Sequence, residues 1–507
     1  MRRSVTTVLL VFAVLAAACS GGEVSPTASP TGSEPPAGGR IVVGATLEPT
    51  TLDITAAAAA AIGEVFLYNV QEGLVKLDDN GHVQPLLAER WDRSADGRAY
   101  TFHLREATFH DGSDFTADDV VYSFERVLDE DSTHPFKAQL AKVESVTAVD
   151  DRTVEIRLTE FSNDFLFSIA QAVGVILSEE SIGQRETSPV GTGPFQFDSR
   201  IPGDSITLAR YDDHWGRGAL LDEVVFKYID DPNALSNALL DGQVDVISRI
   251  TAPEGLGQFT QEAGFTVIDG LTNGEIILAM NNARPPLDDV RVRQAITHAI
   301  DRQGIVDAAY AGYGELIGSH VPPQDPWYVD LTDAVPYDPA RARELLAEAG
   351  HADDITLALR LPPPSYARRS GELIASQLGE VGITVTIEPV EFPVWLEEVF
   401  NADQYDLTVI SHVEPHDFVQ YGNAEYYWNY DSPEVREWLA NADRELDIGR
   451  RNELYAQVQQ RITEDAVNVW LFLLPNLAVL REGIDGYQHN RISTSLDMTA
   501  VSITPRS

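Results

Sequence analysis

The second half of the chain alternates between the sequence patterns of strands and helices, and this alternation limits the fold more than any other feature. Apolar residues recur at every second position in the strand-like segments, and every three or four positions in the helical ones. Asp338, Pro339 and Gly350 are residue types that begin and end helices. The pattern predicts strands at 355–361, 383–390 and 405–411, and helices at 338–350, 367–382 and 392–400. Repeated alternation of this kind predicts an α/β lobe.

The first half of the chain has a different pattern, in which strand-like segments are separated by turns. Alternating residues predict strands at 100–110, 151–159 and 204–211. A helix is predicted at 115–128, where Thr116 and Asp119 have the spacing of a capping box. Further helical segments are predicted at 230–242 and 287–310. The apolar run 467–480 contains two Asn and a Pro, so it is interpreted as a buried strand and turn.

The N-terminus has the layout of a secretory signal. Arg2 and Arg3 precede an apolar segment, residues 8–18, which is too short to span a bilayer as a helix of about 20 residues. "LAAAC" at residues 15–19 resembles the lipobox of bacterial lipoproteins, with Ala16 where leucine is usual. We therefore expect a signal peptide at 1–18 and lipidation of Cys19. We also expect residues 19–39 to form a flexible linker after the lipidated cysteine, because they are rich in Gly, Pro, Ser and Thr.

Composition excludes several classes of function. The formal net charge is −43, from 79 acidic and 36 basic residues, which argues against nucleic-acid binding because phosphate contacts need a basic surface. Cys19 is the single cysteine, so no internal disulfide can form. The chain lacks the GxSxG, HExxH and CxxC motifs of common hydrolases and redox proteins. We expect no enzymatic activity and no cofactor.

Eight segments, in their order along the chain, resemble the extracellular solute-binding proteins of ABC importers, in particular the peptide- and nickel-binding family known as family 5. The most specific is residues 85–127, "PLLAERWDRSADGRAYTFHLREATFHDGSDFTADDVVYSFERV". The others are 49–54, 70–78, 189–197, 211–231, 238–246, 281–306 and 337–350. Together they are distributed over nearly all of residues 40–507.

The resemblance implies a periplasmic-binding-protein-like fold of the class II, cluster C type, with two α/β lobes, a hinge and an extra inserted domain. The expected boundaries are 40–72, 183–272 and 481–507 for the first lobe, 73–182 for the inserted domain, and 273–480 for the second lobe. The implied protein is a monomeric lipoprotein, anchored outside the cytoplasm to the cell membrane. It would capture short peptides in the interlobe cleft and deliver them to the permease and ATPase subunits. The alternative ligand is a nickel or other metal chelate, an opine or another amino-acid-derived solute. A further alternative function is that of a secreted metal-dependent hydrolase.

"SHVEPHDF", residues 411–418, directly follows a predicted strand, where α/β folds usually place ligand-contacting loops. The resemblance relates this segment to the one that binds the peptide amine, with His412 in place of the usual tryptophan. Three interpretations stay open. Glu414 or Asp417 pairs with a ligand cation; or His412, Glu414 and His416 bind a metal, if the segment is extended; or the segment is a solvated loop.

Two other segments contribute candidate ligand-binding residues. Arg368 and Arg369 lie in "SYARRSGELI", which resembles the arginine-containing segment that meets the peptide carboxylate in some dipeptide binders. Alternatively, they lie near a helix start and pair with surface carboxylates. Tyr427 and Trp428 lie in "YYWNY", which is dense in aromatic residues and lines either the cleft or the core.

Overall fold

The computed structural model describes residues 37–261, 263–351 and 355–504. The predicted signal peptide, Cys19 and most of the linker lie outside these residues. In the described part of the chain, no helix has both the length and the apolar character needed to cross a membrane.

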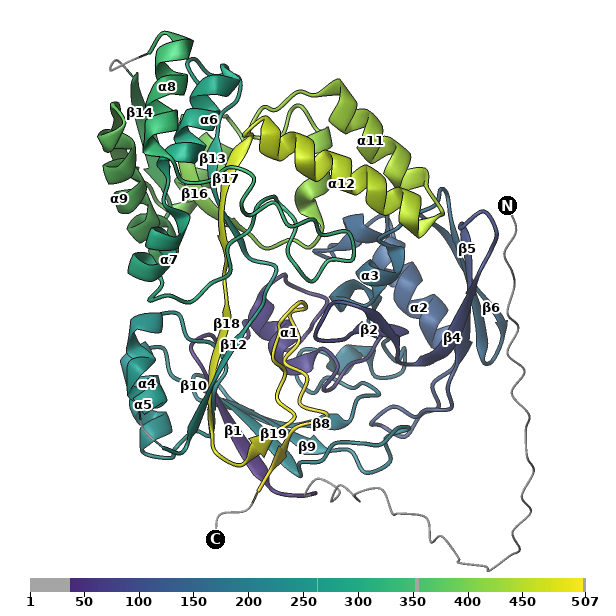
Figure 1. The fold of residues 1–507 in the computed structure, drawn as a ribbon. Helices are drawn as coiled ribbons and strands as arrows, with labels where there is room; N and C mark the ends of the chain where they lie inside the picture. Colours follow the sequence, from purple (N-terminus) through teal and green to yellow (C-terminus); the bar gives the residue numbers. More distant parts are fainter. Residues whose placement is uncertain (1–36, 262, 352–354, 505–507) are drawn as a thin grey trace, which may run out of the picture. The chain divides into compact units, whose positions relative to one another are not determined.

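The first lobe is built on a seven-stranded sheet with the order β12-β18-β11-β1-β10-β9-β8 (Figure 1). Its central strand β1 pairs in parallel with β10 and β11, whereas the outer pairs are antiparallel. Its strands are β1 (Arg40–Ala45), β8 (Phe195–Ile201), β9 (Ser205–Arg210), β10 (Glu223–Tyr228), β11 (Val246–Ile247), β12 (Phe265–Gly270) and β18 (Asn476–Arg481). Its helices are α1 (Ala60–Phe66), α4 (Pro232–Leu240) and α5 (Gly257–Gln261).

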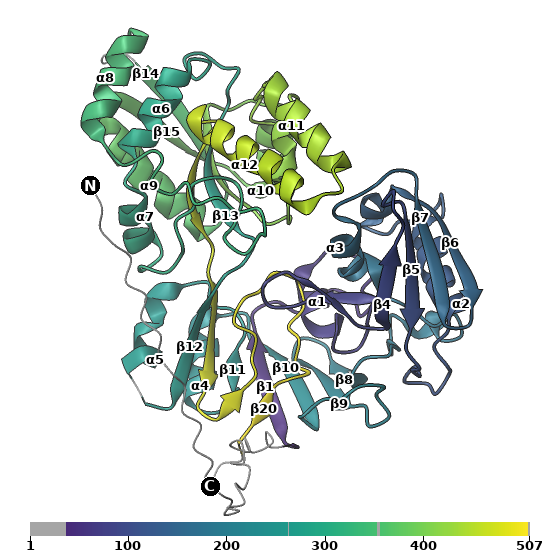
Figure 2. The same cartoon turned by 45° about the vertical axis from the view of Figure 1, so that its right-hand side comes forward.

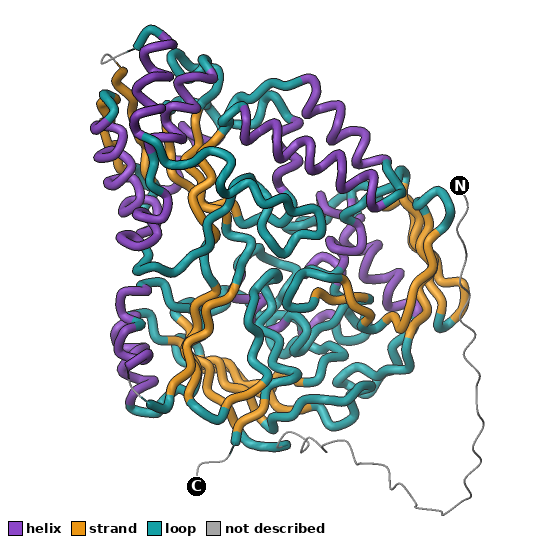
Figure 3. Tube along the Cα trace, in the orientation of Figure 1, coloured by secondary structure: helices purple, strands orange, loops and turns teal. Residues whose placement is uncertain are grey.

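The second lobe is built on a five-stranded sheet with the order β15-β14-β16-β13-β17. Its strands are β13 (Glu275–Met280), β14 (Ile355–Leu361), β15 (Ile383–Pro389), β16 (Leu407–His412) and β17 (Asn468–Leu473). Its helices are α6 (Val290–Ala299), α7 (Arg302–Ala309), α8 (Pro339–Ala349), α9 (Ser365–Glu380), α10 (Phe392–Val394), α11 (Pro433–Arg444) and α12 (Ile448–Glu464). Figure 3 shows the helices gathered around this sheet, while much of the chain near the first-lobe sheet is loop.

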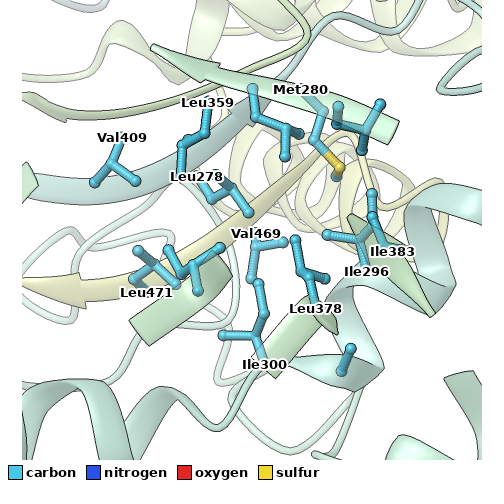
Figure 4. Close-up of a cluster of buried hydrophobic side chains, with 14 of the residues drawn as sticks. Leu278, Met280, Ile296, Ile300, Leu359, Leu378, Ile383, Val409, Val469 and Leu471 are labelled. Carbon is cyan, nitrogen blue, oxygen red and sulfur yellow. The ribbon is translucent and has the colours of Figure 1, made fainter. Parts of the chain in front are cut away.

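The core of the second lobe lies between its strands and helices α6 to α9. Side chains from neighbouring strands meet those from the helices in one apolar cluster (Figure 4). Its labelled members are Leu278, Met280, Ile296, Ile300, Leu359, Leu378, Ile383, Val409, Val469 and Leu471. Each large aliphatic side chain buried in this way contributes about 1.5–3 kcal/mol to folding. The cluster therefore holds β13 and β16 rigidly side by side.

The inserted domain contains a four-stranded sheet with the order β4-β5-β7-β6, with α2 against β6 and β7 (Figure 2). Its strands are β4 (Ala88–Arg93), β5 (Ala99–Leu104), β6 (Val143–Asp150) and β7 (Thr153–Leu158), and its helices are α2 (Ala117–Leu128) and α3 (Phe165–Ile169). A separate pair, β2 (Val75–Leu77) and β3 (Val83–Pro85), precedes it, and β19 (Ile484–Asp485) pairs with β20 (Ser502–Ile503) near the C-terminus. The predicted capping box of Thr116 and Asp119 is present at the start of α2. The architecture of two α/β lobes with an extra domain confirms the predicted fold class.

Several local predictions are refined by the structure. Helix α8 begins after Asp338, whose carboxylate accepts two backbone N–H groups, and ends at Gly350 in the left-handed conformation. The predicted helical stretch 287–310 consists of two helices, because the Asp301 side chain caps a new helix, α7. The predicted helix at 392–400 begins as α10 and continues as a π-helix over Trp395–Phe400.

The chain crosses between the lobes at residues 271–274 and again at 474–475. At the second crossing, β17 of the second lobe leads through Leu474 and Pro475 directly into β18 of the first lobe (Figure 1). All six residues of β18 pair with β12, so the strand belongs to the first-lobe sheet. The expected boundary after residue 480 therefore falls inside this strand and has to move to the crossing at 474–475. The misplacement arose because the apolar run 467–480 is continuous in sequence but contributes to two sheets.

Candidate functional site

Strand β16 delivers the "SHVEPHDF" segment to one edge of the second-lobe sheet. The strand is buried on both faces between β13 and β14, and its last residue is His412. The ladder places His412 opposite Glu275, the first residue of β13. Side chains directly opposite each other in an antiparallel pair have Cβ atoms about 5 Å apart. A buried histidine and a buried glutamate are therefore neighbours at the point where the strand ends.

Asp417 lies between two histidines from different segments. The Asp417 Oδ2 atom is 2.6 Å from His412 Nδ1, and its Oδ1 atom is 3.0 Å from His320 Nε2. Burial alone would raise the pKa of Asp417, but His320 and His412 hold it well below its ordinary value. Asp417 is therefore a carboxylate at neutral pH.

Tyrosine hydroxyls complete the contacts of the two histidines. His412 Nε2 is 3.0 Å from the Tyr427 hydroxyl, and His320 Nδ1 is 2.8 Å from the Tyr421 hydroxyl. The Tyr421 hydroxyl also accepts a hydrogen bond from Asn468 Nδ2 at 2.9 Å. If each histidine directs its N–H at Asp417, each remaining ring nitrogen accepts from a tyrosine, so both rings can be neutral.

Glu275 is a buried acid in this region with an unsatisfied carboxyl oxygen. Its residue is 3% exposed, and its Oε2 atom has no hydrogen-bond partner in the described part of the chain. Burial, followed by the charge of Asp417 and more weakly those of Asp325 and Glu414, raises the pKa of Glu275 well above its ordinary value. A cation bound beside it would reverse that effect. We refer to Glu275, Glu414, Asp417, His320 and His412 as the acidic cluster.

The other two predicted residues of the segment point in different directions. Glu414 is exposed, and its carboxylate accepts the Val413 N–H at 3.3 Å. His416 has a φ of 62°, and its Nδ1 atom is 3.1 Å from Asp164 Oδ1 in the inserted domain. The chain leaves the strand after His412 and enters a turn, so the extended conformation required for a metal set of His412, Glu414 and His416 is absent. That set of metal ligands is not brought together.

The structure does bring together a different group of ligand types. The ligand atoms of His320, His412 and Asp417 all lie within 4.8 Å of one another. His320 comes from the irregular segment 310–338, between α7 and α8. No periodic pattern or motif marks it in the sequence. Glu275 did have a detectable signal, because it is a charged residue at the start of a fully apolar strand.

The predicted aromatic pair lies behind the acidic cluster. Tyr427 is 2% exposed, and Trp428 is fully buried and stacked on Tyr421 with ring centroids 4.4 Å apart. The Tyr427 hydroxyl reaches His412, whereas the Trp428 ring packs in the apolar core. The pair therefore fixes the orientation of the histidine and tyrosine rings around Asp417.

The predicted arginines lie on an exposed part of α9. Arg369 Nη2 is 2.7 Å from Glu254 Oε1, which belongs to the first lobe, and about half of each side chain is exposed. Arg368 is exposed as well. Arg369 thus has a partner within the chain, and the contact joins the two lobes.

Comparisons with known proteins agree with this architecture. Residues 82–432 match the sequence profile of the bacterial extracellular solute-binding proteins, family 5 Middle. Heme-binding protein A of Haemophilus influenzae is 32% identical over 358 residues, which are 64% of this chain and 65% of the relative, so the match spans slightly less than two thirds of that protein. Di/tripeptide-binding protein 1 of Pseudomonas aeruginosa is 28% identical over 432 residues, which are 75% of this chain and 79% of the relative.

A solved structure shares the fold. The periplasmic binding protein DppA of Helicobacter pylori, in complex with the peptide STSA, matches with a TM-score of 0.75 at 24% identity. The match covers 92% of this chain and 98% of that protein.

Proposed function

The chain belongs to the bacterial extracellular solute-binding proteins of family 5, and we propose that it captures short peptides between its two lobes and delivers them to the permease and ATPase subunits of an ABC importer. The protein carries out no chemistry on the ligand. Closure of the lobes around the peptide stabilises the bound state, because the closed form makes contacts that the open form lacks.

The observation that carries this proposal is the buried carboxyl group of Glu275. Its Oε2 atom has no partner among the described residues, and Asp417 and Glu414 surround it with negative charge. Buried polar groups normally have partners, so an exception of this kind points to a ligand group. An α-amine supplies both the positive charge and the hydrogen-bond donors that these carboxyl groups need.

The relatives support peptides as the ligand class. The Pseudomonas relative is named for di- and tripeptides, and the Helicobacter structure contains a peptide. Glu414 and Asp417 are our candidates for pairing with the peptide amine, with Glu275 added from the structure. Tyr427 and Trp428 support the histidines, and Arg368 and Arg369 remain candidates for contact with the peptide carboxylate.

A metal chelate is the second candidate ligand, favoured by the convergence of His320, His412 and Asp417. Imidazole and carboxylate are ligand types that suit nickel and zinc. An opine or another amino-acid-derived solute, which also carries an amine and a carboxylate, fits the acidic cluster as well.

Native mass spectrometry of the mature protein, purified without denaturation, tests these alternatives. A series of small peptide masses retained on the protein supports peptide capture. A single retained mass with a metal isotope pattern, lost on adding a chelator, supports the metal chelate. If neither is retained and no peptide binds when added, the proposal is wrong.

We propose further that Cys19 is lipidated and holds the protein at the outer face of the cell membrane. Cys19→Ser should move the protein from the membrane fraction to the soluble extracytoplasmic fraction. Unchanged retention in the membrane fraction would contradict lipidation at this residue.

A further inference from the structure

A second polar cluster lies in the first lobe, away from the "SHVEPHDF" segment in sequence, and it contains one buried arginine, Arg491, and one partly exposed arginine, Arg249. It consists of Glu64 on α1, Arg249 after β11, and Tyr487 and Arg491 in the segment after β18, and we refer to it as the arginine cluster. Glu64 Oε1 is 2.6 Å from Arg249 Nη2 and 3.5 Å from Arg491 Nη1. Two guanidinium groups therefore share one carboxylate, and the cluster has an excess of positive charge.

Arg491 is the residue of this cluster whose burial is hardest to explain by folding alone. It is 7% exposed, yet none of its three guanidinium nitrogens has a hydrogen-bond partner among the described residues. A guanidinium group carries five N–H donors, and burying such a group without partners is costly. Its contact with Glu64, at 3.5 Å, satisfies charge only in part.

Arg293 shows what a structural arginine with the same burial looks like in this protein. It is 6% exposed, and its guanidinium group donates hydrogen bonds to the carbonyl oxygens of Leu287, Asp465 and Ala466. The fold can thus satisfy a buried arginine fully when the role is structural. The unsatisfied donors of Arg491 are therefore a local property of its site and not a general feature of buried arginines here.

Tyr487 adds a neutral hydrogen-bonding group to the same site. Its hydroxyl is buried and has no partner in the described part of the chain. Burial raises the pKa of Tyr487 to about 12, although Arg491 and Arg249 oppose the shift. The hydroxyl is therefore protonated at neutral pH and can donate a hydrogen bond to an anion beside the two arginines.

The site lies at the crossing between the lobes. The backbone N–H of Arg491 donates to the Leu271 carbonyl at 2.8 Å, and the backbone of Arg491 forms a parallel β-bridge with Thr272. Residues 271–274 connect β12 of the first lobe to β13, which begins with Glu275 of the acidic cluster. The backbone of Arg491 is thus held by the connection that leads directly to the acidic cluster of the second lobe.

We propose that Arg491 and Arg249, with the Tyr487 hydroxyl, form an anion subsite that binds a carboxylate group of the transported ligand. This inference rests on the proposed function and extends it, because it assigns the negatively charged group of the ligand to the first lobe. A planar carboxylate can accept two hydrogen bonds from one guanidinium group, which makes arginine the suited residue for this recognition. The carboxylate is either the peptide C-terminus or an acidic side chain.

Isothermal titration of the ligand-free mature protein with matched peptides tests the subsite. The probes are a mixture of di- to pentapeptides with free carboxyl termini, the same mixture amidated at the C-terminus, and amidated peptides that contain aspartate. Succinate, which has carboxylates but no amine, serves as a fourth probe. Its binding is measured as a shift in the thermal unfolding temperature at constant chloride concentration. Preference for free termini identifies the C-terminus, and rescue by aspartate identifies a side chain.

Arg491→Gln should weaken binding of the carboxylate-bearing peptide roughly 10- to 100-fold, as expected for the loss of a charge-assisted contact. It should leave the weak binding of the fully amidated peptides unchanged. Glu64 keeps Arg249 as its partner in this variant, so the fold should be retained. Tyr487→Phe, which removes only the hydroxyl, should weaken binding several-fold and provides a second test if Arg491→Gln does not fold. Arg210→Gln, which removes a partly exposed arginine paired with Asp212 and Asp222, is the matched control and should bind like wild type.

The outcomes separate the subsite from the proposed function. If wild type binds free peptides, amidated peptides and amidated peptides that contain aspartate equally, or if Arg491→Gln and Tyr487→Phe bind free peptides as wild type does, the subsite is wrong while peptide capture stands. If no peptide binds, peptide capture is wrong. In that case, stabilisation of wild type but not of Arg491→Gln by succinate supports the subsite, and its absence overturns it.

Discussion

In the second lobe, Asp417 is held by two histidines that are themselves held by tyrosines, whereas in the first lobe Arg491 is buried with one distant ion pair. Two members of the acidic cluster, Glu275 and His412, lie at strand ends, and Asp417 is fixed between two histidines in front of stacked aromatic rings. The arginine cluster depends on loop segments beside the crossing at 271–274. The difference shows that a buried charge can be fully partnered or nearly unpartnered, and only the second kind is a candidate for a ligand contact.

The two clusters also differ in sign and in lobe. A ligand with an amine and a carboxylate would satisfy one cluster with each end and so contact both lobes. Binding energy from such a ligand favours the arrangement of the lobes in which it contacts both clusters. The following substitutions test this comparison, beginning with the largest expected effect.

Asp417→Asn should lower the free energy of unfolding by about 3 kcal/mol, because it removes the charged acceptor shared by two buried histidine N–H groups. Urea unfolding followed by tryptophan fluorescence measures the change. Glu414→Gln, at an exposed position in the same loop, is the control and should change stability by less than about 0.5 kcal/mol. Both variants should bind peptide more weakly than wild type. Equal stability of Asp417→Asn and wild type would contradict the conclusion that the partners of Asp417 stabilise the fold.

Arg491→Met should leave the free energy of unfolding unchanged or raise it by about 1 kcal/mol, because unsatisfied buried donors are removed. Peptide binding should fall in the same variant, so stability and function change in opposite directions. The measurement is urea unfolding of the ligand-free protein beside a binding titration. A loss of more than about 2 kcal/mol would show that Arg491 holds the fold together.

Glu275→Gln should change the free energy of unfolding by less than about 1 kcal/mol near pH 4. As pH rises, the variant should become increasingly more stable than wild type. The folded-state pKa of Glu275 lies above its ordinary value of 4.5 because of burial. Wild type therefore loses stability as pH rises from 4.5 toward the raised pKa, while the glutamine variant does not titrate. Unfolding curves at several pH values measure the difference. Parallel pH profiles for the two proteins would contradict a neutral, buried Glu275.

His416→Gln should show the smallest effect, at most about 1 kcal/mol, because its partner Asp164 is half exposed. Burial opposes protonation, but Asp164 and Asp325 raise the pKa of His416 above its ordinary value of 6.5. The stabilisation is present below 6.5 and is lost as pH rises through the raised pKa. Thermal unfolding near pH 6 and about pH 9 should therefore separate the variant from wild type only at the lower value. His489→Gln, at an exposed histidine, is the control.

The alternation of strands and helices was sufficient to predict both the α/β class and the placement of "SHVEPHDF" after a strand. Helix caps such as Asp338 and the box at Thr116 were predicted correctly because their chemistry is local. The sequence could not show that β18 joins the first-lobe sheet, since the choice of ladder partner depends on contacts far apart in the chain. The sequence shows residues 467–480 as one continuous apolar run, and it does not show that the run contributes to two different sheets.

The candidate site was predicted only in part, for a related reason. His412 and Asp417 are five positions apart, so a local motif could reveal them together. His320 and Arg491 come from irregular segments, and each reaches its cluster through tertiary packing that no periodic pattern records. The useful signal for Glu275 was its charge at the start of an apolar strand, and for Arg491 no equivalent signal existed.

The position of β18 has a consequence for the order in which the protein folds. This strand lies between β12 and β11, one place in from the edge of a sheet whose central strand is β1, near the start of the described chain. The first-lobe sheet cannot be completed until residue 481 has been synthesised, and pairing over such sequence separation is slow. The first lobe of a growing chain therefore remains incomplete for most of its synthesis, and a lobe that has not yet closed its sheet is easier to unfold for passage across a membrane. Completion of the sheet is delayed until the C-terminal strand arrives.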